Sequence, residues 1–197
     1  SVRWTDMGML NLGDNNLSLN FLNARQEAYL SNITWKRFDI RGGLRNDIFD
    51  IRNVKSSQIL GDYDFTTLRN DFVSLFLDSR ADTFNDGYFP TKGFTAGIDY
   101  SWVFAGFPRR IHNFHALQAD AKIVLPAGDL FALIPSFNFR FLFGEDIPVA
   151  YFNAMGGSLP GRFVDQQMPF VGITNLTAMK NILTTFRTDF RFRVVKN

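Results

Sequence analysis

The sequence predicts an all-β, antiparallel fold made of long strands, each with one apolar face and one polar face. The first observation is a two-residue period: apolar and polar residues alternate in segments that begin at Phe94, His115 and Phe131. Only an extended strand turns successive side chains to opposite faces. The second observation is composition, because 23 of the 197 residues are Phe. Phe side chains at every second position of a strand create an apolar face, and that face must be shielded from water.

Composition excludes several classes of protein. A hydrophobic fraction of 46% excludes a disordered chain. The net charge is only +2, and cations and anions are interleaved, so no nucleic-acid partner is expected. The absence of cysteine excludes a disulfide scaffold and thiolate metal sites. No apolar run reaches 18 residues, so no membrane-spanning helix is expected. Because there is no initiating Met and no signal peptide, the chain is expected to be a mature or excised piece.

The first third of the chain is the less regular part. Residues 1–16 are predicted to be a loose lead-in, and 17–30 a strand, with a short helix over Ala24–Leu30 as the alternative. Gly42-Gly43 is predicted to be a two-residue hairpin turn between the charged strands 33–41 and 44–53. Residues 55–64 are predicted to be a polar loop.

From residue 67 the pattern is regular. Strands are predicted at Thr67–Thr83, Phe94–Phe104, His115–Leu125, Phe131–Phe143 and Asn181–Val195, with a turn at Asn85-Asp86-Gly87. Residues 107–113 and 126–129 are short connections. Residues 144–179 are rich in Gly, Pro and Asn and have no sustained period, so they are predicted to be a long functional loop. No domain boundary is evident within residues 1–197.

Three features favour a membrane barrel over a soluble β-sandwich binding module. Three of the predicted strands have 11 to 15 residues, which exceeds the length usual in globular sheets and suffices for a tilted bilayer crossing of about 9–11 residues. Their apolar faces are rich in Phe, and their opposite faces carry several charges. Tyr88, Tyr100, Trp102 and Tyr151 lie near strand ends, as in interfacial aromatic girdles. The sandwich remains the alternative.

Three landmarks within about 80 residues resemble one family. The segment 82–94, DTFNDGYFPTKGF, resembles a strand–turn–strand signature of the BamA/TamA outer-membrane barrel superfamily, also called the bacterial surface antigen family. The segment 119–129, ADAKIVLPAGD, is similar to the next strand and its short turn. The segment 150–164, AYFNAMGGSLPGRFV, resembles the long sixth extracellular loop. The family's Arg-Gly-Phe tip is replaced here by Gly161-Arg162-Phe163.

The resemblance implies a bacterial outer-membrane location and a sixteen-stranded antiparallel transmembrane β-barrel with a long extracellular loop. Residues 1–197 would be an incomplete segment of it, without an upstream domain and the C-terminal strands. The loop sequence is most similar to the C-terminal barrels of Bacteroidetes patatin-like phospholipases. The implied function is therefore an anchor or translocation module, non-catalytic in this segment, attached to a patatin-like lipid acyl hydrolase. The alternative is the barrel of an outer-membrane protein assembly or transport factor.

In a barrel, the alternation assigns each strand residue to lipid or to the lumen. The residues expected to face lipid are Phe94, Ile98, Trp102, Phe137, Phe139, Phe141, Phe186, Phe190 and Phe192. The charged residues that face the lumen are expected to form cross-strand ion pairs that stiffen the barrel wall. The alternative is that they select a permeating solute. These charges are Asp99, Asp120, Lys122, Arg140, Arg187, Asp189, Arg191 and Arg193.

The resemblance also implies a docking role for the sixth loop. Arg162 is expected to reach into the lumen and pair with carboxylates of the wall, while the glycines supply positive φ and close backbone approach. The loop-six motif comprises Gly156, Gly157, Gly161, Arg162 and Phe163. The expected partners are outer-membrane lipids and, at the open sheet edges, a second copy or the remaining strands of the same polypeptide.

No catalytic, cofactor or metal site is expected in this segment. His112 and His115 are three residues apart, but no Cys and no acidic pair accompanies them. The stretch from Gly156 to Pro160 lacks the closing glycine of a Gly-x-Ser-x-Gly elbow.

Overall fold

A computed structural model describes most of the chain. The backbone is described for residues 2–12, 15–35, 37–56, 69–107, 111–128, 130–145, 147–148, 151–156, 167–168, 170, 176–179 and 181–192. Side chains are described for residues 22–31 and 37–50, and for those of the ranges above that lie between 69 and 170 or between 181 and 192.

The chain folds as one β-sheet, as its alternating sequence predicts. The strand order is β11-β7-β6-β5-β4-β3-β2-β1-β10-β8-β9. All pairings are antiparallel except β1 with β10 and β8 with β9. The strands are β1 (Val2–Leu12), β2 (Asn15–Trp35), β3 (Phe38–Ser56), β4 (Arg69–Asp82), β5 (Gly93–Phe107), β6 (Asn113–Ala127), β7 (Phe131–Glu145), β8 (Asn153–Met155), β9 (Gln167–Met168), β10 (Leu176–Met179) and β11 (Ile182–Phe192).

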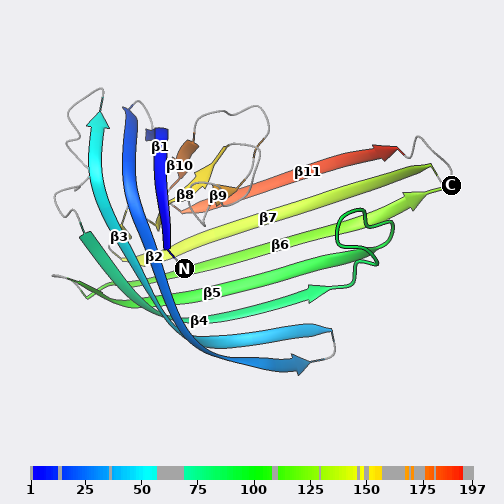
Figure 1. The fold of residues 1–197 in the computed structure, drawn as a ribbon, viewed down its shortest axis with the longest axis horizontal. Coiled ribbons are helices and arrows are strands. Elements are labelled where there is room, and N and C mark those ends of the chain that lie inside the picture. The colour runs from blue at the N-terminus through cyan, green and yellow to red at the C-terminus, as the bar shows by residue number, and fades with distance from the viewer. Residues whose placement is uncertain are drawn as a thin grey trace.

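The sheet curls, so that one face is concave (Figure 1). The long strands β2 and β3 bend strongly, and their ends rise together with β1 and β10 beside the short strands β8 and β9 (Figure 1). Among the described strands, the marginal strands β11 and β9 do not pair with each other, so these strands do not form a closed barrel. No helix in the described part of the chain is long and apolar enough to cross a bilayer.

The strands β4–β7 and β11 coincide with the alternating segments of the sequence. Strands of 14 or 15 residues occupy the predicted positions of β4–β7, and β11 runs for 11 residues. Ala24–Leu30 lies within β2, so the helical alternative is wrong. The lead-in prediction for residues 1–16 is also wrong, because residues 2–12 form β1 and β2 begins at Asn15. The long loop at 144–179 contains the short strands β8, β9 and β10.

The predicted hairpin turn at Gly42-Gly43 is wrong. The strand β3 continues without interruption through both glycines, and the chain reverses between Trp35 and Phe38. Gly43 lies between Tyr29 of β2 and Phe76 of β4. The rings of Tyr29 and Phe76 meet edge to face at 6.3 Å between their centroids. The glycine pair therefore serves close strand and ring packing, not a reversal of the chain.

Gly43→Ala is expected to destabilise the fold by about 1–3 kcal/mol, the cost of overpacking. A Cβ on Gly43 would lie 2.1 Å from the carbonyl oxygen of Ala28 and 2.6 Å from the Tyr29 Cα. Gly87→Ala is the matched control, because a Cβ there has no neighbour within 4 Å. Urea unfolding in detergent measures both. Equal midpoints for the two variants would contradict this account of Gly43.

The strands β4–β7 have two ends with different connections. At the end here called the loop end, the connections span residues 57–68, 108–112 and 146–152 onward. At the opposite end, called the turn end, they span residues 83–92 and 128–130. The longest connections, 57–68 and the one that follows β7, lie at the loop end, although 83–92 at the turn end is longer than 108–112.

Candidate functional site

The convex face of β4–β7 and β11 carries the nine side chains predicted to face lipid. Directly opposed residues in an antiparallel pair share a face, and the pairing places Phe137 beside Phe186 and Ala121. Phe186, Phe190 and Phe192 are 68%, 65% and 70% exposed. The same registers place the whole set on this face: Phe94, Ile98, Trp102, Phe137, Phe139, Phe141, Phe186, Phe190 and Phe192.

The convex face is uncharged across these five strands except at the loop end. Its charged residues are Arg69 and Asp71 of β4, which form an ion pair, and Glu145 of β7. Asp71 and Glu145 pair with Phe107 and Asn113 at the ends of their strands. Between that level and the turn end, the convex positions hold apolar residues, Ser, Thr, one His and one Tyr. A band without charge is what a hydrocarbon layer requires.

An aromatic cluster on the convex face lies near the loop end. His115 stacks against Tyr100, Trp102 and Phe143, and the closest ring centroid, that of Phe143, is 4.7 Å away. The Tyr100 hydroxyl lies 2.8 Å from His115 Nδ1, and Trp102 Nε1 donates to Asn113 Oδ1 at 3.1 Å. Rings with a polar edge are typical of the level at which a bilayer meets water.

Two other residues of the predicted girdle lie elsewhere. Tyr88 is in the 83–92 connection, and Tyr151 is buried against the concave face. His112 also belongs to the concave side, where it contacts Phe72. The two histidines therefore do not converge, and the described residues contain no group of three metal-ligating His, Cys, Asp or Glu side chains.

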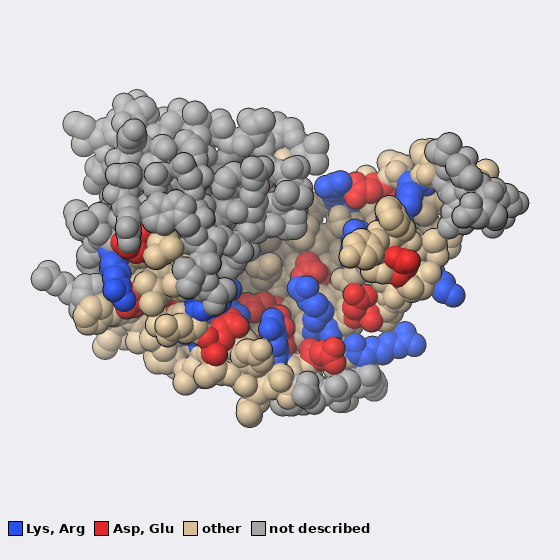
Figure 2. All heavy atoms as spheres, viewed as in Figure 1, with Lys and Arg blue, Asp and Glu red and all other residues tan. Residues whose placement is uncertain are grey.

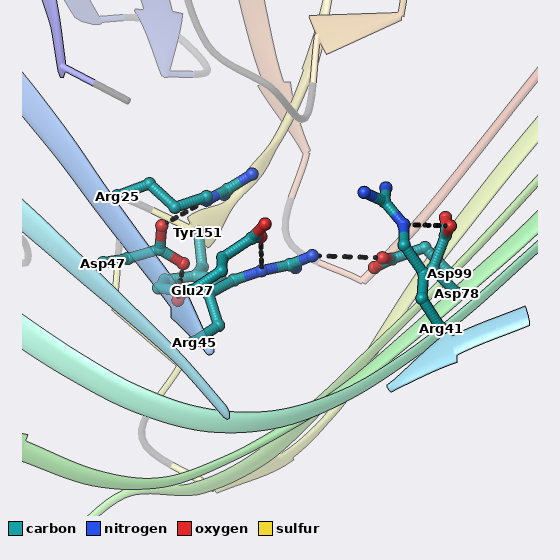
Figure 3. A network of polar contacts seen from close by, with 8 residues as sticks. All are labelled: Arg25, Glu27, Arg41, Arg45, Asp47, Asp78, Asp99 and Tyr151. Carbon is teal, nitrogen blue, oxygen red and sulfur yellow. Dashed lines mark hydrogen bonds and ion pairs between the residues drawn. The ribbon is translucent and has the colours of Figure 1, made fainter. Parts of the chain in front are cut away.

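The concave face is lined with ion pairs. Arg45 of β3 is central: its Nε contacts Glu27 Oε1 at 2.7 Å, and its second guanidinium nitrogen lies 3.4 Å from Asp99 Oδ2. The guanidinium also lies over the Phe76 ring, 4.4 Å from its centroid. Figure 3 shows this network crossing from β2 to β5 above the sheet. Basic and acidic side chains are interleaved over the hollowed face (Figure 2).

The predicted lumen charges lie on this concave face where they are described. Asp99 and Asp120 pair with Arg45 and Arg80. Arg187 pairs with Asp189 of its own strand at 2.7 Å rather than with a neighbouring strand. Lys122 is exposed and lies beside Thr95 and Ser136. Arg140 is buried, and Arg191 donates a hydrogen bond to a backbone carbonyl oxygen. Arg193 lies outside the described residues.

A segment that follows β7 is held against the concave face. The Tyr151 ring packs edge to face against Phe49, Phe72 and Phe114, with centroids 4.9 to 5.9 Å away. Its hydroxyl donates to Asp47 Oδ2 at 3.0 Å. Asp47 is 2% exposed and also pairs with Arg25 at 2.6 Å (Figure 3). Tyr151 and Asp47, which are 104 positions apart in the sequence, therefore meet in one buried contact.

Arg140 fixes the backbone of the same segment. It is 5% exposed, and it donates to the Tyr151 carbonyl oxygen at 3.0 Å and to Asn153 Oδ1. Its role is therefore a clamp on the segment rather than a charge presented to a solute. Gly156, at φ 139°, accepts a hydrogen bond from Gln167 Nε2 at 2.7 Å through its carbonyl oxygen. The other residues of the loop-six motif, Gly157, Gly161, Arg162 and Phe163, lie outside the described residues.

Sequence reasoning missed Asp47, Tyr151 and Arg45. The signal was present in the alternation of Arg41, Arg45 and Asp47 along β3. The incorrectly predicted turn at Gly42-Gly43 divided β3 into two strands. It therefore concealed that the β3 residues Arg41, Arg45 and Asp47 share a face with Asp78 and Phe72 of β4.

Tyr151 lies outside the long strands, and its pKa is raised well above the ordinary value by burial and by the Asp47 carboxylate. The protonated hydroxyl therefore contributes stability that is fully present below the unfolded-state pKa of about 10 and is lost as the pH rises through the folded-state pKa.

Tyr151→Phe is expected to lower the free energy of unfolding at neutral pH by about 1.5–3 kcal/mol, the range for a hydrogen bond to a charged group. It is also expected to flatten the fall in stability above a pH of about 10. Denaturant unfolding of both proteins over a pH series measures this. The same alkaline slope in the wild type and the variant would show that Tyr151 does not carry the effect.

Comparison with known families agrees with this architecture. A sequence model of the OMP85 superfamily matches residues 3–197, nearly the whole chain. No curated protein matches the chain.

Proposed function

We propose, because the chain belongs to the OMP85 superfamily, that it forms the wall of an outer-membrane β-barrel that anchors and positions a patatin-like phospholipase. Superfamily membership supports the outer-membrane barrel role. In this proposal the segment itself is non-catalytic, and the acyl hydrolase is another domain of the same protein.

The observation that carries the proposal is the contrast between the two sheet faces. A soluble sandwich would cover its apolar face with a second sheet, yet Phe186, Phe190 and Phe192 are each at least 65% exposed. Contiguous exposed apolar surface of this kind suits lipid rather than water. The opposite face holds cross-strand ion pairs such as Arg45–Asp99 and Arg80–Asp120, which suit the interior of a barrel.

The segment from Tyr151 to Gly156 supports an anchoring or positioning role over that of an open pore. It occupies the concave side and is held there by Asp47 and Arg140. A chain segment fixed inside the lumen reduces the room for a permeating solute. Substrate access, in this proposal, is to the domain that the barrel positions at the membrane.

The sheet margins indicate which partners the proposal requires. Among the described strands, β11 pairs with β7 alone, so its other edge has unpaired backbone groups. A bilayer does not tolerate an open edge. We therefore expect further strands of the same polypeptide, or a second copy, to pair there, with outer-membrane lipids around the convex face.

The attachment to a phospholipase is tested on the full-length protein. Its coding sequence upstream of Ser1 is expected to contain a Gly-x-Ser-x-Gly elbow. Replacing that serine with Ala is expected to abolish fatty-acid release from phospholipid vesicles without changing the heat-modifiable gel migration of the barrel. The absence of the elbow would overturn the phospholipase assignment and leave an assembly or transport factor.

A further inference from the structure

The connection between β4 and β5 is a rigid unit at the turn end. Residues 83–92 are here called the strap. Asp86 Oδ1 accepts hydrogen bonds from the backbone N–H groups of Tyr88 and Phe89 at 2.7 and 2.9 Å. Asn85 Oδ1 accepts two more, from Thr91 and Lys92, at 3.0 and 3.1 Å. Side chains that bond their own backbone in this way fix the shape of a loop.

The base of the strap is fixed as well. The Thr83 N–H donates to the Phe94 carbonyl oxygen at 2.9 Å, and the Phe94 N–H donates to Thr83 Oγ1 at the same distance. Gly93 has φ 111°, and a Cβ there would lie 2.4 Å from the Thr83 carbonyl oxygen. This backbone conformation and this close approach both require glycine. The strap therefore leaves the sheet in one defined direction.

That direction is across the concave face. Arg191 of β11 donates to the Pro90 carbonyl oxygen at 2.7 Å, although β6 and β7 separate β11 from β5 in the sheet. Figure 1 shows the strap folded back over the ends of β5 and β6. Pro90 is buried, whereas Tyr88 and Phe89 at the tip are 89% and 73% exposed.

Two apolar side chains on the concave face support the same placement. Val124 of β6 and Ile134 of β7 are each 3% exposed. They lie near the turn end, where Val124 pairs with Gly93 and Ile134 with Asp189. Their neighbours Lys122 and Ser136 on this face are polar. Apolar residues at the mouth of a water-filled lumen would be exposed, so their burial indicates a cover.

We infer that the strap closes the turn end of the barrel lumen and that the Arg191–Pro90 hydrogen bond is its latch. The inference rests on the barrel of the proposed function. The lumen then has two internal barriers, the segment around Tyr151 and the strap. Anything that leaves by the turn end must displace the strap from Val124 and Ile134, and the latch is the contact that spans the mouth.

The test measures access to Val124 in the full-length protein. Residues 1–197 contain no cysteine, so Val124→Cys introduces one reporter of similar size into this segment. Any cysteine elsewhere in the full-length protein is first replaced with Ser. The reaction of the reporter with a charged, water-soluble methanethiosulfonate reagent is expected to be slow. Adding Arg191→Ala is expected to speed the reaction about tenfold or more, the factor expected when a charged hydrogen bond that holds the closed state is lost. Arg191→Lys is expected to restore part of the protection.

Arg187→Ala is the matched control, because Arg187 is on the same strand and face but pairs with Asp189 instead of the strap. It is expected to leave the labelling rate unchanged. Fast labelling of the Val124→Cys variant, or equal labelling rates with and without Arg191→Ala, would contradict the inference that the strap closes the lumen. Heat-modifiable migration of each variant reports the barrel separately, so fast labelling of a variant with an intact barrel rejects closure by the strap and leaves the barrel assignment unaffected.

Discussion

Phe139→Arg is expected to destabilise the inserted protein by about 2–4 kcal/mol, the cost of a cation at the bilayer midplane on the lipid face of a barrel. Phe139 lies near the middle of β7, on the convex face, where it pairs with Ala119 and Thr184. The guanidinium would have no carboxylate on that face at the same level. Urea unfolding in detergent or lipid vesicles measures the change.

Asn138→Arg is the matched control, because it adds the same side chain one position away and on the opposite face. Asn138 pairs with Asp120 across the sheet, so the new cation would have an anion beside it, and the cost is expected to be within about 1 kcal/mol. Similar losses for the two variants would contradict the assignment of the faces. Arg140→Leu is not a suitable control, since Arg140 is buried and clamps Tyr151.

Asp47→Ala is expected to destabilise the protein by about 3–5 kcal/mol, the cost of removing one partner from a buried ion pair. Asp47 is 2% exposed and receives both the Arg25 guanidinium and the Tyr151 hydroxyl. Its loss removes the acceptor of the Tyr151 hydroxyl and one ion-pair partner of Arg25, and it releases the segment around Tyr151. Unfolding midpoints, together with the protease sensitivity of residues 147–156, measure the two consequences.

Asp189→Ala serves as the comparison for Asp47→Ala, because the Arg187–Asp189 pair is solvent-exposed. Exposed pairs contribute about 0–1 kcal/mol. A double variant of Asp47→Ala with Tyr151→Phe is expected to cost less than the sum of the single changes, since the two residues share one hydrogen bond. Additive losses, or an Asp47→Ala effect as small as that of Asp189→Ala, would contradict the docked segment.

The strand pattern was predictable because lipid and lumen impose opposite chemistry on alternate residues. From Phe131 to Phe143, apolar rings alternate with Ser136, Asn138 and Arg140, and this fixes both the strand and its faces. Gly42-Gly43 could not be interpreted in the same way. Two glycines suit a turn and close strand packing equally well, and the ring contact of Tyr29 with Phe76 that decides between them is absent from the local sequence.

The candidate site was only partly predictable for a related reason. Alternation indicates that Asp99 and Arg140 share a face, but it does not give their partners. Arg45 reaches Asp99 from 54 positions away, and Tyr151 reaches Asp47 from 104. Such contacts depend on the curl of the sheet and on the path of the chain after β7, which no short-range pattern encodes.

A single-cysteine scan of β11 tests the membrane-wall assignment most directly. Each residue from 184 to 189 is replaced in turn with Cys, labelled with a fluorophore and reconstituted in vesicles that contain brominated lipid as a quencher. Quenching is expected at Thr184, Phe186 and Thr188, which face outward, and not at Thr185, Arg187 and Asp189. Quenching without a two-residue period, or at none of the six positions, would contradict a β11 that lies in the wall of a membrane barrel.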